Sequence, residues 1–188
     1  MMKRLFIALP LDEEGRKKLR VAWQTFERFD STLKRVSPDQ YHLTLKFLGD
    51  TSEETVRGLM ESFSSLATVP AIHYSLKGLG AFPQVSSPSV IWAGIETGPV
   101  LKTLVQKVEE LALGLGFPRE KRSFSPHLTL ARVKRNRSVP GELVSYITEN
   151  RETLFGDEIF RTLVLYESVL SKTGPQYTEL ATLSLNGE

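Results

Sequence analysis

The sequence contains one tetrapeptide twice, His-Leu-Thr-Leu, at residues 42–45 and again at residues 127–130. Only three histidines occur in the 188 residues, so two of the three begin the same motif. Composition alone would produce such a repeat at a frequency on the order of one in several hundred, which makes coincidence a poor explanation. We interpret the repeat as the sign of an internal duplication that gives two similar α+β lobes.

Both copies lie in segments that read as extended strands. Side chains alternate between the two faces of a strand, so His and Thr point to one side and the two Leu to the other. His42 and Thr44 would then share one face, as would His127 and Thr129. Strict alternation also sets Lys46 on the face of His42, beside the proposed site, and the alternative is a lysine at the strand edge.

The pattern of apolar and turn-forming residues predicts the other elements. Strands are expected at residues 4–9, 33–36, 42–49, 71–80, 90–95, 127–133, 159–170 and 177–185, the last two forming a closing hairpin. Helices are expected at residues 12–29, 51–67, 98–116 and 140–150. Asp12 would cap the first helix, and Thr51 with Glu54 has the spacing of a capping box. Residues 82–89 read as a turn-rich connection.

This order of elements predicts an α+β fold in which residues 1–188 form a single bilobal domain. Each lobe carries an antiparallel-rich sheet with helices on its outside, and the two sheets form a central cleft. No segment is long enough or low enough in complexity to act as a linker, so we expect one compact unit. A pseudo-twofold axis between the lobes would turn both histidines and both threonines into the cleft.

Composition excludes several kinds of chemistry. The sequence has no cysteine, which rules out disulfides, thiolate nucleophiles and cysteine-based metal sites. The histidines lack a metal-binding spacing, so no metal site is expected, and the third of them, His73, is interpreted as structural or surface. No phosphate-binding G-x-x-x-x-G-K-[ST] loop occurs, so no nucleotide cofactor is expected either.

Two further features concern location and partners. The apolar run at residues 5–9 is too short for a signal peptide or a membrane span, so we expect a cytoplasmic protein without a membrane partner. The net charge is only +2, but basic residues cluster at 16–20, 119–122 and 132–137. These clusters leave room for an anionic ligand, and the alternative is an ordinary solvated surface.

Two imidazoles on either side of one phosphate can catalyse displacement at phosphorus. The neutral imidazole takes a proton from water, while the protonated one donates a proton to the departing oxygen. Histidine suits both roles because its ordinary pKa of about 6.5 populates both forms near neutral pH. The hydroxyls of Thr44 and Thr129 could donate to the non-bridging oxygens and stabilise the charge of the transition state.

Several segments give the chain a resemblance to a known group of proteins. The sequence reads RLFIAL at 4–9, HLTLKFLG at 42–49, GLGAFP at 78–83, WAG at 92–94, SPHLTLAR at 125–132 and LVLYES at 163–168. These segments resemble the two-histidine (2H) phosphoesterase superfamily and, within it, the bacterial and archaeal RNA 2′,3′-cyclic phosphodiesterases, also called 2′-5′ RNA ligases. The likeness covers nearly the whole chain.

The resemblance implies the bilobal 2H phosphoesterase fold and metal-independent hydrolysis of a terminal 2′,3′-cyclic phosphate on RNA to a 2′-phosphomonoester. It implies that some members also join tRNA halves reversibly through a 2′-5′ bond without ATP. It assigns His42 as the proton donor to the leaving 3′ oxygen and His127 as the proton acceptor, roles that two identical motifs cannot distinguish. It suggests that Arg132 helps to hold the phosphate, which requires a bulge or the end of the strand to bring Arg132 onto the face of His127. A monomer is expected.

Two other functions remain open at this point. The same fold could hydrolyse a small cyclic nucleotide or ADP-ribose cyclic phosphate, and parallel assays on RNA ends and small compounds would separate these substrates. The chain could also be a non-catalytic RNA-binding module, with structural His-Thr repeats and basic loops that bind backbone phosphate. Alanine at positions 42 and 127 would leave such a module unchanged.

Overall fold

The fold is built on one sheet of antiparallel strands, described by a computed structural model for residues 2–171 and 174–185. The strands are β1 Lys3–Pro10, β2 Leu33–Arg35, β3 His42–Thr51, β4 Ile72–Gln84, β5 Ser87–Thr97, β6 His127–Val133, β7 Leu154–Phe160, β8 Thr162–Ser171 and β9 Gly174–Ser184. The α-helices are α1 Glu13–Lys18, α2 Arg20–Glu27, α3 Glu53–Phe63, α4 Pro99–Gly114 and α5 Gly141–Glu149. Short 3-10 turns at Pro38–Gln40 and Ser64–Thr68 complete the described elements.

The order of the strands repeats on the two sides of the sheet. Outward from the centre, β3, β1, β8 and β9 follow on one side, and β6, β5, β4 and β7 on the other, while β2 pairs with β6. In each half, the repeat strand pairs antiparallel with an earlier strand of the chain, β3 with β1 and β6 with β5. The expected pseudo-twofold arrangement is therefore present in the strand order.

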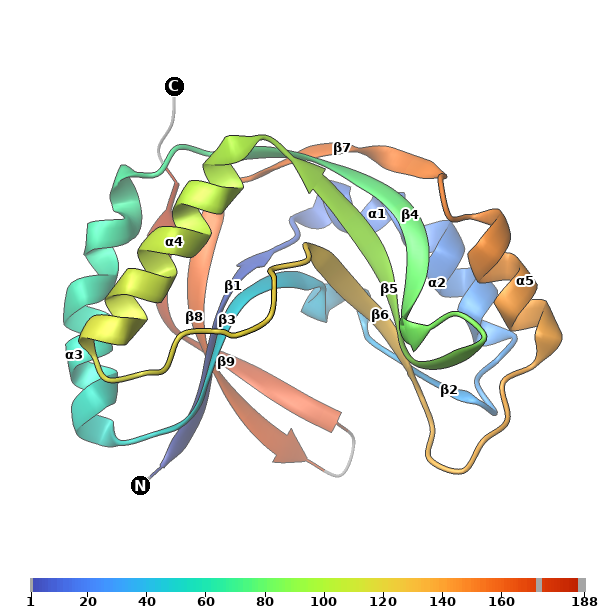
Figure 1. Cartoon of the computed structure of the whole chain (residues 1–188), viewed down its shortest axis with the longest axis horizontal. Helices are drawn as coiled ribbons and strands as arrows, with labels where there is room; N and C mark the ends of the chain where they lie inside the picture. The colour runs from blue at the N-terminus through green and yellow to red at the C-terminus, as the bar shows by residue number, and fades with distance from the viewer. Residues whose placement is uncertain (1, 172–173, 186–188) are drawn as a thin grey trace.

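The two halves meet at the repeats themselves. Leu43 of β3 lies opposite Leu128 of β6, and this is the register pair that joins the two strands. The two sheets expected from the sequence are thus halves of one continuous sheet, joined at a single point and curving apart on either side of it (Figure 1).

Helices cover the outer faces of both halves. Helices α3 and α4 contact β9 and β3 in one half, whereas α1 and α5 contact β7 and β4 in the other. Figure 1 shows α3 and α4 at one end of the molecule and α1, α2 and α5 at the opposite end, with the curved sheet between them. Each group of helices faces the side of the sheet that carries the leucines of the repeats.

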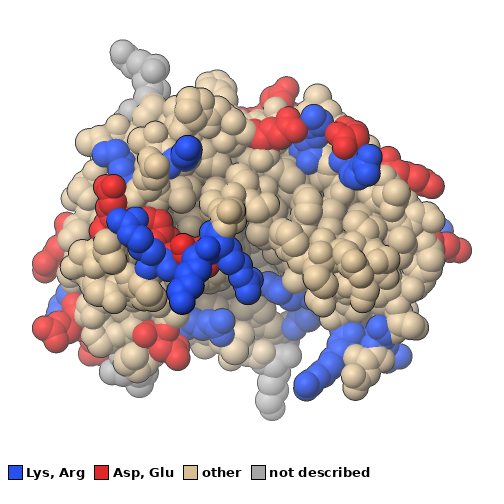
Figure 2. Space-filling model, viewed as in Figure 1, with Lys and Arg blue, Asp and Glu red and all other residues tan. Residues whose placement is uncertain are grey.

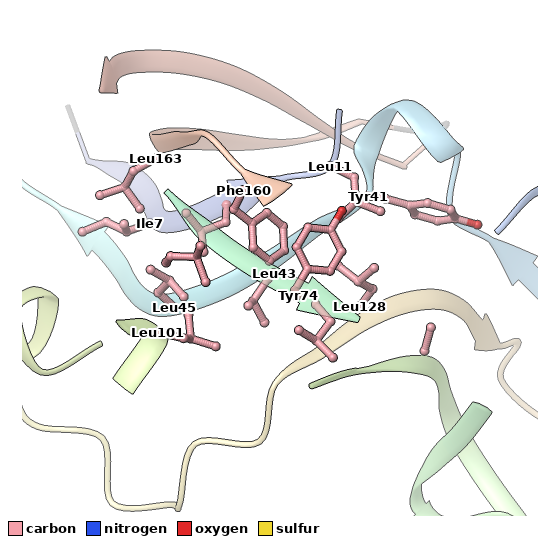
Figure 3. Packing of buried hydrophobic residues seen from close by; sticks show 14 of the residues in the cluster. Ile7, Leu11, Tyr41, Leu43, Leu45, Tyr74, Leu101, Leu128, Phe160 and Leu163 are labelled. Atoms are coloured by element: carbon pink, nitrogen blue, oxygen red, sulfur yellow. The ribbon is translucent and has the colours of Figure 1, made fainter. Parts of the chain in front are cut away.

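The leucines of the repeats are fixed in the hydrophobic core. Leu43 is 1% exposed and Leu128 is 0% exposed, and both belong to the buried cluster that extends through both halves. Figure 3 shows Leu43, Leu45 and Leu128 within this packing, near Tyr74 and Phe160. Burial of these side chains holds both strands against slipping by one residue, because such a shift would move every leucine to the opposite face.

Several boundaries predicted from the sequence are wrong, and the helix predicted at 12–29 is two helices, α1 and α2. The strand predicted at 159–170 is two strands, since β7 ends at Phe160 and pairs with β4, while β8 begins at Thr162 and pairs with β1. Apolar residues lie on both sides of this break, so periodicity does not reveal it. The turn predicted at 82–89 shortens to residues 85–86, because Pro83 and Pro88 oppose each other inside the β4–β5 hairpin.

A further correction concerns the start of α3. The cap is Ser52, whose hydroxyl accepts a hydrogen bond from the N–H of Thr55, and not Thr51. Thr51 is the last residue of β3 and is buried, with its hydroxyl donating to the carbonyl oxygen of Gly49. Asp12 caps α1 as expected, accepting from the N–H of Gly15. Within the described part of the chain, no helix has the length and apolar character needed to cross a membrane.

Candidate active site

The antiparallel junction brings the two repeats together. Because Leu43 and Leu128 are opposite each other, the same register sets His42 beside Thr129 and Thr44 beside His127. All four side chains lie on the face away from the buried leucines, which we call the cleft face. Diagonal neighbours on adjacent antiparallel strands are separated by about 7–8 Å, so the two imidazoles can lie on either side of one phosphate group. The face predicted for these four residues is confirmed.

Each imidazole is oriented by a backbone carbonyl two residues earlier. Nδ1 of His42 is 2.7 Å from the carbonyl oxygen of Gln40, and Nδ1 of His127 is 2.7 Å from the carbonyl oxygen of Ser125. A carbonyl can only accept, so Nδ1 carries the proton in both rings and Nε2 is left available to a ligand. These contacts could not be read from the sequence, because any residue can supply a carbonyl.

Aromatic rings surround His42. Its ring centroid lies 5.0 Å from that of Phe6 and 5.4 Å from that of Tyr177, which meets it edge-on. Tyr166 stacks on Phe6 with a centroid separation of 5.1 Å. Burial in this setting lowers the pKa of His42 from its ordinary value, while the hydrogen bond to Gln40 opposes the shift. Burial therefore favours the neutral form of His42, whereas an anion beside the ring would favour the charged form.

A second aromatic group surrounds His127. The ring of Phe82 meets His127 edge-on at 5.0 Å, and the indole of Trp92 lies at 6.2 Å. The indole fits flat against β4 because the residue opposite it is Gly80, where a Cβ atom would lie 2.2 Å from the ring. The motifs are thus identical in sequence but have different surroundings, which gives the two imidazoles different electrostatic environments.

Lys46 does not lie beside the site, and the placement predicted for it is wrong. In β3 the register shifts between the pairs Ala8–Thr44 and Ile7–Lys46, so one residue is left over as a β-bulge. The bulge turns Lys46 to the core face, where it is 6% exposed. Its Nζ donates to Oε1 of Glu109 at 2.8 Å and to the carbonyl oxygen of Pro118 at 2.9 Å.

The same bulge turns Phe47 toward the cleft face. Phe47 pairs with Phe6, and its ring lies 6.0 Å from the ring of Phe6, which also contacts His42. Phe47 is 70% exposed, which is unusual for a large apolar side chain one ring away from a half-buried histidine. Strict alternation places this residue on the core face, so the sequence pattern did not reveal its position.

An equivalent bulge in β6 brings Arg132 to the cleft face. The register shifts between the pairs Trp92–Thr129 and Ile91–Ala131, after which Arg132 lies opposite Val90 on β5 and Lys34 on β2. Arg132 needed a bulge to reach the face of His127, and this bulge is present. Like charges directly opposite each other are destabilising in a sheet, so the Arg132–Lys34 pair favours an anion between the two side chains.

Arg4 is a further cation at the cleft, and it was not among the site residues predicted from the sequence. Burial raises the pKa of Tyr177, and the positive charges of Arg132 and Arg4 oppose this shift, which places both guanidinium groups near its phenol. Arg4 precedes Phe6 by two residues on β1, so alternation along that strand could have revealed it. Among residues 2–171 and 174–185, neither guanidinium forms an ion pair with a carboxylate, which leaves both charges available to an anion.

The third histidine lies outside this arrangement. His73 is an exposed residue of β4, opposite Ile159 of β7, in the outer part of one half of the sheet. No group of three or more histidine, aspartate and glutamate side chains is arranged to hold a metal ion within the described residues. The candidate site therefore consists of the two His-Thr pairs, with Arg132 and Arg4 at its edge.

The arrangement provides two oriented imidazoles, two hydroxyls on the same face and cations at one edge. These groups suit in-line displacement on an anionic phosphorus centre. The fold and the site define the class of protein as a two-histidine phosphoesterase.

Comparison with known proteins agrees with this class. The family model described as LigT like Phosphoesterase matches residues 9–92 and 95–177, so each matched segment contains one repeat. An RNA 2′,3′-cyclic phosphodiesterase of Archaeoglobus fulgidus is 35% identical over 178 residues, covering 94% of this chain and 97% of that protein. One of Thermus thermophilus is 38% identical over 193 residues, covering 98% and 91%.

Solved structures give the same result. The crystal structure of TT0787 of Thermus thermophilus matches with a TM-score of 0.83 at 33% sequence identity, covering 98% of this chain and 99% of that chain. The crystal structure of E. coli LigT complexed with 3′-AMP matches with a TM-score of 0.75 at 25% identity, covering 100% of both chains. The protein belongs to the LigT-like phosphoesterase family.

Proposed function

We propose that the protein hydrolyses the 2′,3′-cyclic phosphate at the end of an RNA to a 2′-phosphomonoester. The observation that carries this proposal is the register at Leu43 and Leu128. In this register the two imidazoles are diagonal neighbours on adjacent strands, and each has a threonine hydroxyl opposite it. Relatives named RNA 2′,3′-cyclic phosphodiesterase, matched over nearly the whole chain, support the choice of substrate.

In the proposed reaction the two histidines have opposite tasks. Nε2 of His127 takes a proton from water as its oxygen attacks the phosphorus. Nε2–H of His42 donates a proton to the 3′ oxygen as the P–O3′ bond breaks, which leaves a 3′-hydroxyl and a 2′-phosphate. His42 must hold a proton for this step, although burial lowers its pKa. The negative charge of the cyclic phosphate supplies the compensation, because a nearby anion favours imidazolium.

The remaining groups would hold the phosphate. The hydroxyls of Thr44 and Thr129 would donate to the two non-bridging oxygens, where charge is concentrated in the transition state. Arg132 would supply a positive charge, and its planar guanidinium can form two parallel hydrogen bonds to phosphate oxygens. Lys46 has no part in this scheme, because its ammonium is buried on the opposite face of β3.

The same groups can join two RNA ends. A 5′-hydroxyl then takes the place of water, His127 takes its proton and His42 donates to the 3′ oxygen, which leaves a 2′-5′ phosphodiester. In the reverse direction the two histidines exchange their roles. Reversible joining of ends such as tRNA halves without ATP is thus part of the proposal, because it needs no more groups than the hydrolysis uses.

Product analysis tests the proposed hydrolysis. We expect a short RNA with a 2′,3′-cyclic phosphate end to be converted to the 2′-phosphate and not to the 3′-phosphate, at a rate unchanged by a chelator. The two products separate by chromatography and differ in their sensitivity to enzymes that require a free 2′- or 3′-hydroxyl. A 3′-phosphate product would contradict the assignment of the leaving oxygen, and no product at all would contradict the proposed function.

A further inference from the structure

A basic loop lies between the end of α4 and the second repeat. Arg119, Lys121 and Arg122 are exposed within a stretch that leads to Ser125, whose carbonyl oxygen orients His127. Figure 2 shows lysine and arginine side chains gathered over this loop, beside a recessed part of the same face. Figure 1 shows the loop passing in front of β3 before it enters β6, the two strands that carry the site.

A buried ion pair between Lys46 and Glu109 holds the loop in place. Nζ of Lys46 is 2.8 Å from Oε1 of Glu109 on α4 and donates to the carbonyl oxygen of Pro118 at 2.9 Å. The other carboxylate oxygen, Oε2 of Glu109, accepts from the N–H of Glu120 at 3.3 Å. Pro118 and Glu120, on either side of Arg119, are therefore both attached to one charged pair.

The loop also has internal hydrogen bonds. The carboxylate of Glu120 accepts from the backbone N–H of Lys121 at 2.9 Å and of Arg122 at 3.1 Å. These contacts lower the pKa of Glu120, which keeps the carboxylate ionised. They involve only the backbone of the basic residues. Within the described part of the chain, the side chains of Arg119, Lys121 and Arg122 form no ion pair, so their charges face solvent.

The position of Lys46 needs an explanation other than stability. Its side chain is 4% exposed and that of Glu109 is 14% exposed, so both charges have lost most of their hydration. A buried ion pair is commonly no more stabilising than two apolar side chains of similar volume. The specific effect of this pair is to fix Pro118 and Glu120. It therefore also orients the loop that carries the three cations.

We propose that the loop 118–122 binds the phosphate backbone of RNA next to the reactive end, and that Lys46 and Glu109 are positioning residues for this interaction. The inference rests on the proposed function and names its substrate class: an RNA several nucleotides long, in preference to a mononucleotide. Fixed cations that follow the backbone are the usual means of binding single-stranded nucleic acid without reading its sequence.

The test compares two substrates, a 2′,3′-cyclic mononucleotide and an RNA about 12 nucleotides long with the same cyclic end, a length within the usual span of a single-strand binding groove. The triple variant R119A/K121A/R122A should raise the ratio of the KM for the RNA to the KM for the mononucleotide by about tenfold or more. RNA binding should also depend less on salt, with a slope smaller by about 0.7 for each phosphate that the loop no longer neutralises. The matched control R20A/R57A/K102A removes three exposed cations from the outer helices and should leave the ratio unchanged.

A second variant isolates the positioning role. K46M/E109M removes both buried charges, leaves the net charge of the protein unchanged and retains the three cations of the loop. We expect a similar thermal midpoint, since apolar side chains replace the pair, together with a several-fold rise in the same KM ratio.

The outcomes separate this inference from the proposed function. Wild-type protein that hydrolyses neither substrate contradicts the proposed function itself. Wild-type protein that hydrolyses both, with a ratio that neither variant changes, overturns the inference and leaves the proposed function standing. An equal effect of the matched control would also overturn it, because general positive charge, and not this loop, would then attract the RNA.

Discussion

Alanine at position 42 or at position 127 is expected to lower kcat on a 2′,3′-cyclic phosphate by about 10²–10⁴-fold, the range for loss of a general acid or base. Each variant removes one of the two imidazoles that the junction of β3 and β6 brings together. The fold should be retained, because the hydrophobic core at this junction is formed by the leucines next to the histidines.

His73 provides the control for this experiment. It is the third histidine of the chain, exposed on β4 and away from the cleft, so H73A should keep wild-type turnover. H42A/H127A should be little worse than either single variant, because groups that act as a unit have effects that do not add. Equal turnover in H42A and wild type would contradict the two-histidine site, and RNA binding without any turnover in wild type would favour a binding module.

The next largest effect is expected at the threonines. T44V and T129V remove a hydroxyl with little change in shape, and each should lower kcat by about 10²-fold or more, as loss of one donor to a developing oxyanion does in other enzymes. KM should change less, since the hydrogen bonds strengthen as charge develops. T44S and T129S retain the hydroxyl and should recover most of the activity.

This pair of variants also distinguishes catalysis from structure. If the valine variants lose thermal stability in parallel with kcat, and the serine variants do not recover activity, the threonines are structural. If KM rises while kcat stays at the wild-type value, the hydroxyls bind substrate and transition state equally and do not have the proposed role.

The central part of the site could be predicted from the sequence because it depends on the simplest property of a strand. Alternation places His42 and Thr44 on one face, and the identical motif predicts the same for His127 and Thr129. The repeat also indicates a pseudo-twofold relation, which the strand order contains.

The rest depended on features that alternation does not describe. A bulge in each repeat strand moves Lys46 into the core and brings Phe47 and Arg132 to the cleft. For Arg132 the need for a bulge could be stated in advance, since the resemblance required it near the phosphate. For Lys46 no such requirement existed, and the regular pattern predicted the wrong face. Tyr177 lies beside His42 only because β1 pairs with both β3 and β8, and the second of these pairings is distant in sequence.

The different surroundings of the two histidines could likewise not be predicted from the motifs. Their sequences and their Nδ1 contacts are equivalent, but only His42 lies between Phe6 and Tyr177. Burial there lowers the pKa of His42, so the proton donor of the proposed reaction is a histidine that holds its proton weakly in the free enzyme.

This property makes the pH dependence of the reaction a direct test of the two roles. Activity should require a protonated His42 and a neutral His127, which gives a bell-shaped profile of kcat/KM. The acid limb of the profile follows the lower pKa of the two histidines, and the alkaline limb follows the higher pKa. The acid limb should therefore lie below the ordinary histidine pKa of about 6.5, because the pKa of His42 is lowered. In the profile of kcat this limb should move to higher pH, since the bound phosphate raises the pKa of His42.

The decisive measurement is the pH profile of kcat/KM for wild-type protein and for the residual activity of H42A and H127A. We predict a bell in wild type. H42A should lose the alkaline limb and reach a plateau at high pH, because no group then has to hold a proton, and H127A should lose the acid limb instead. An alkaline limb that remains in H42A, or a wild-type profile without one, would contradict the assignment of His42 as the proton donor of a two-histidine site.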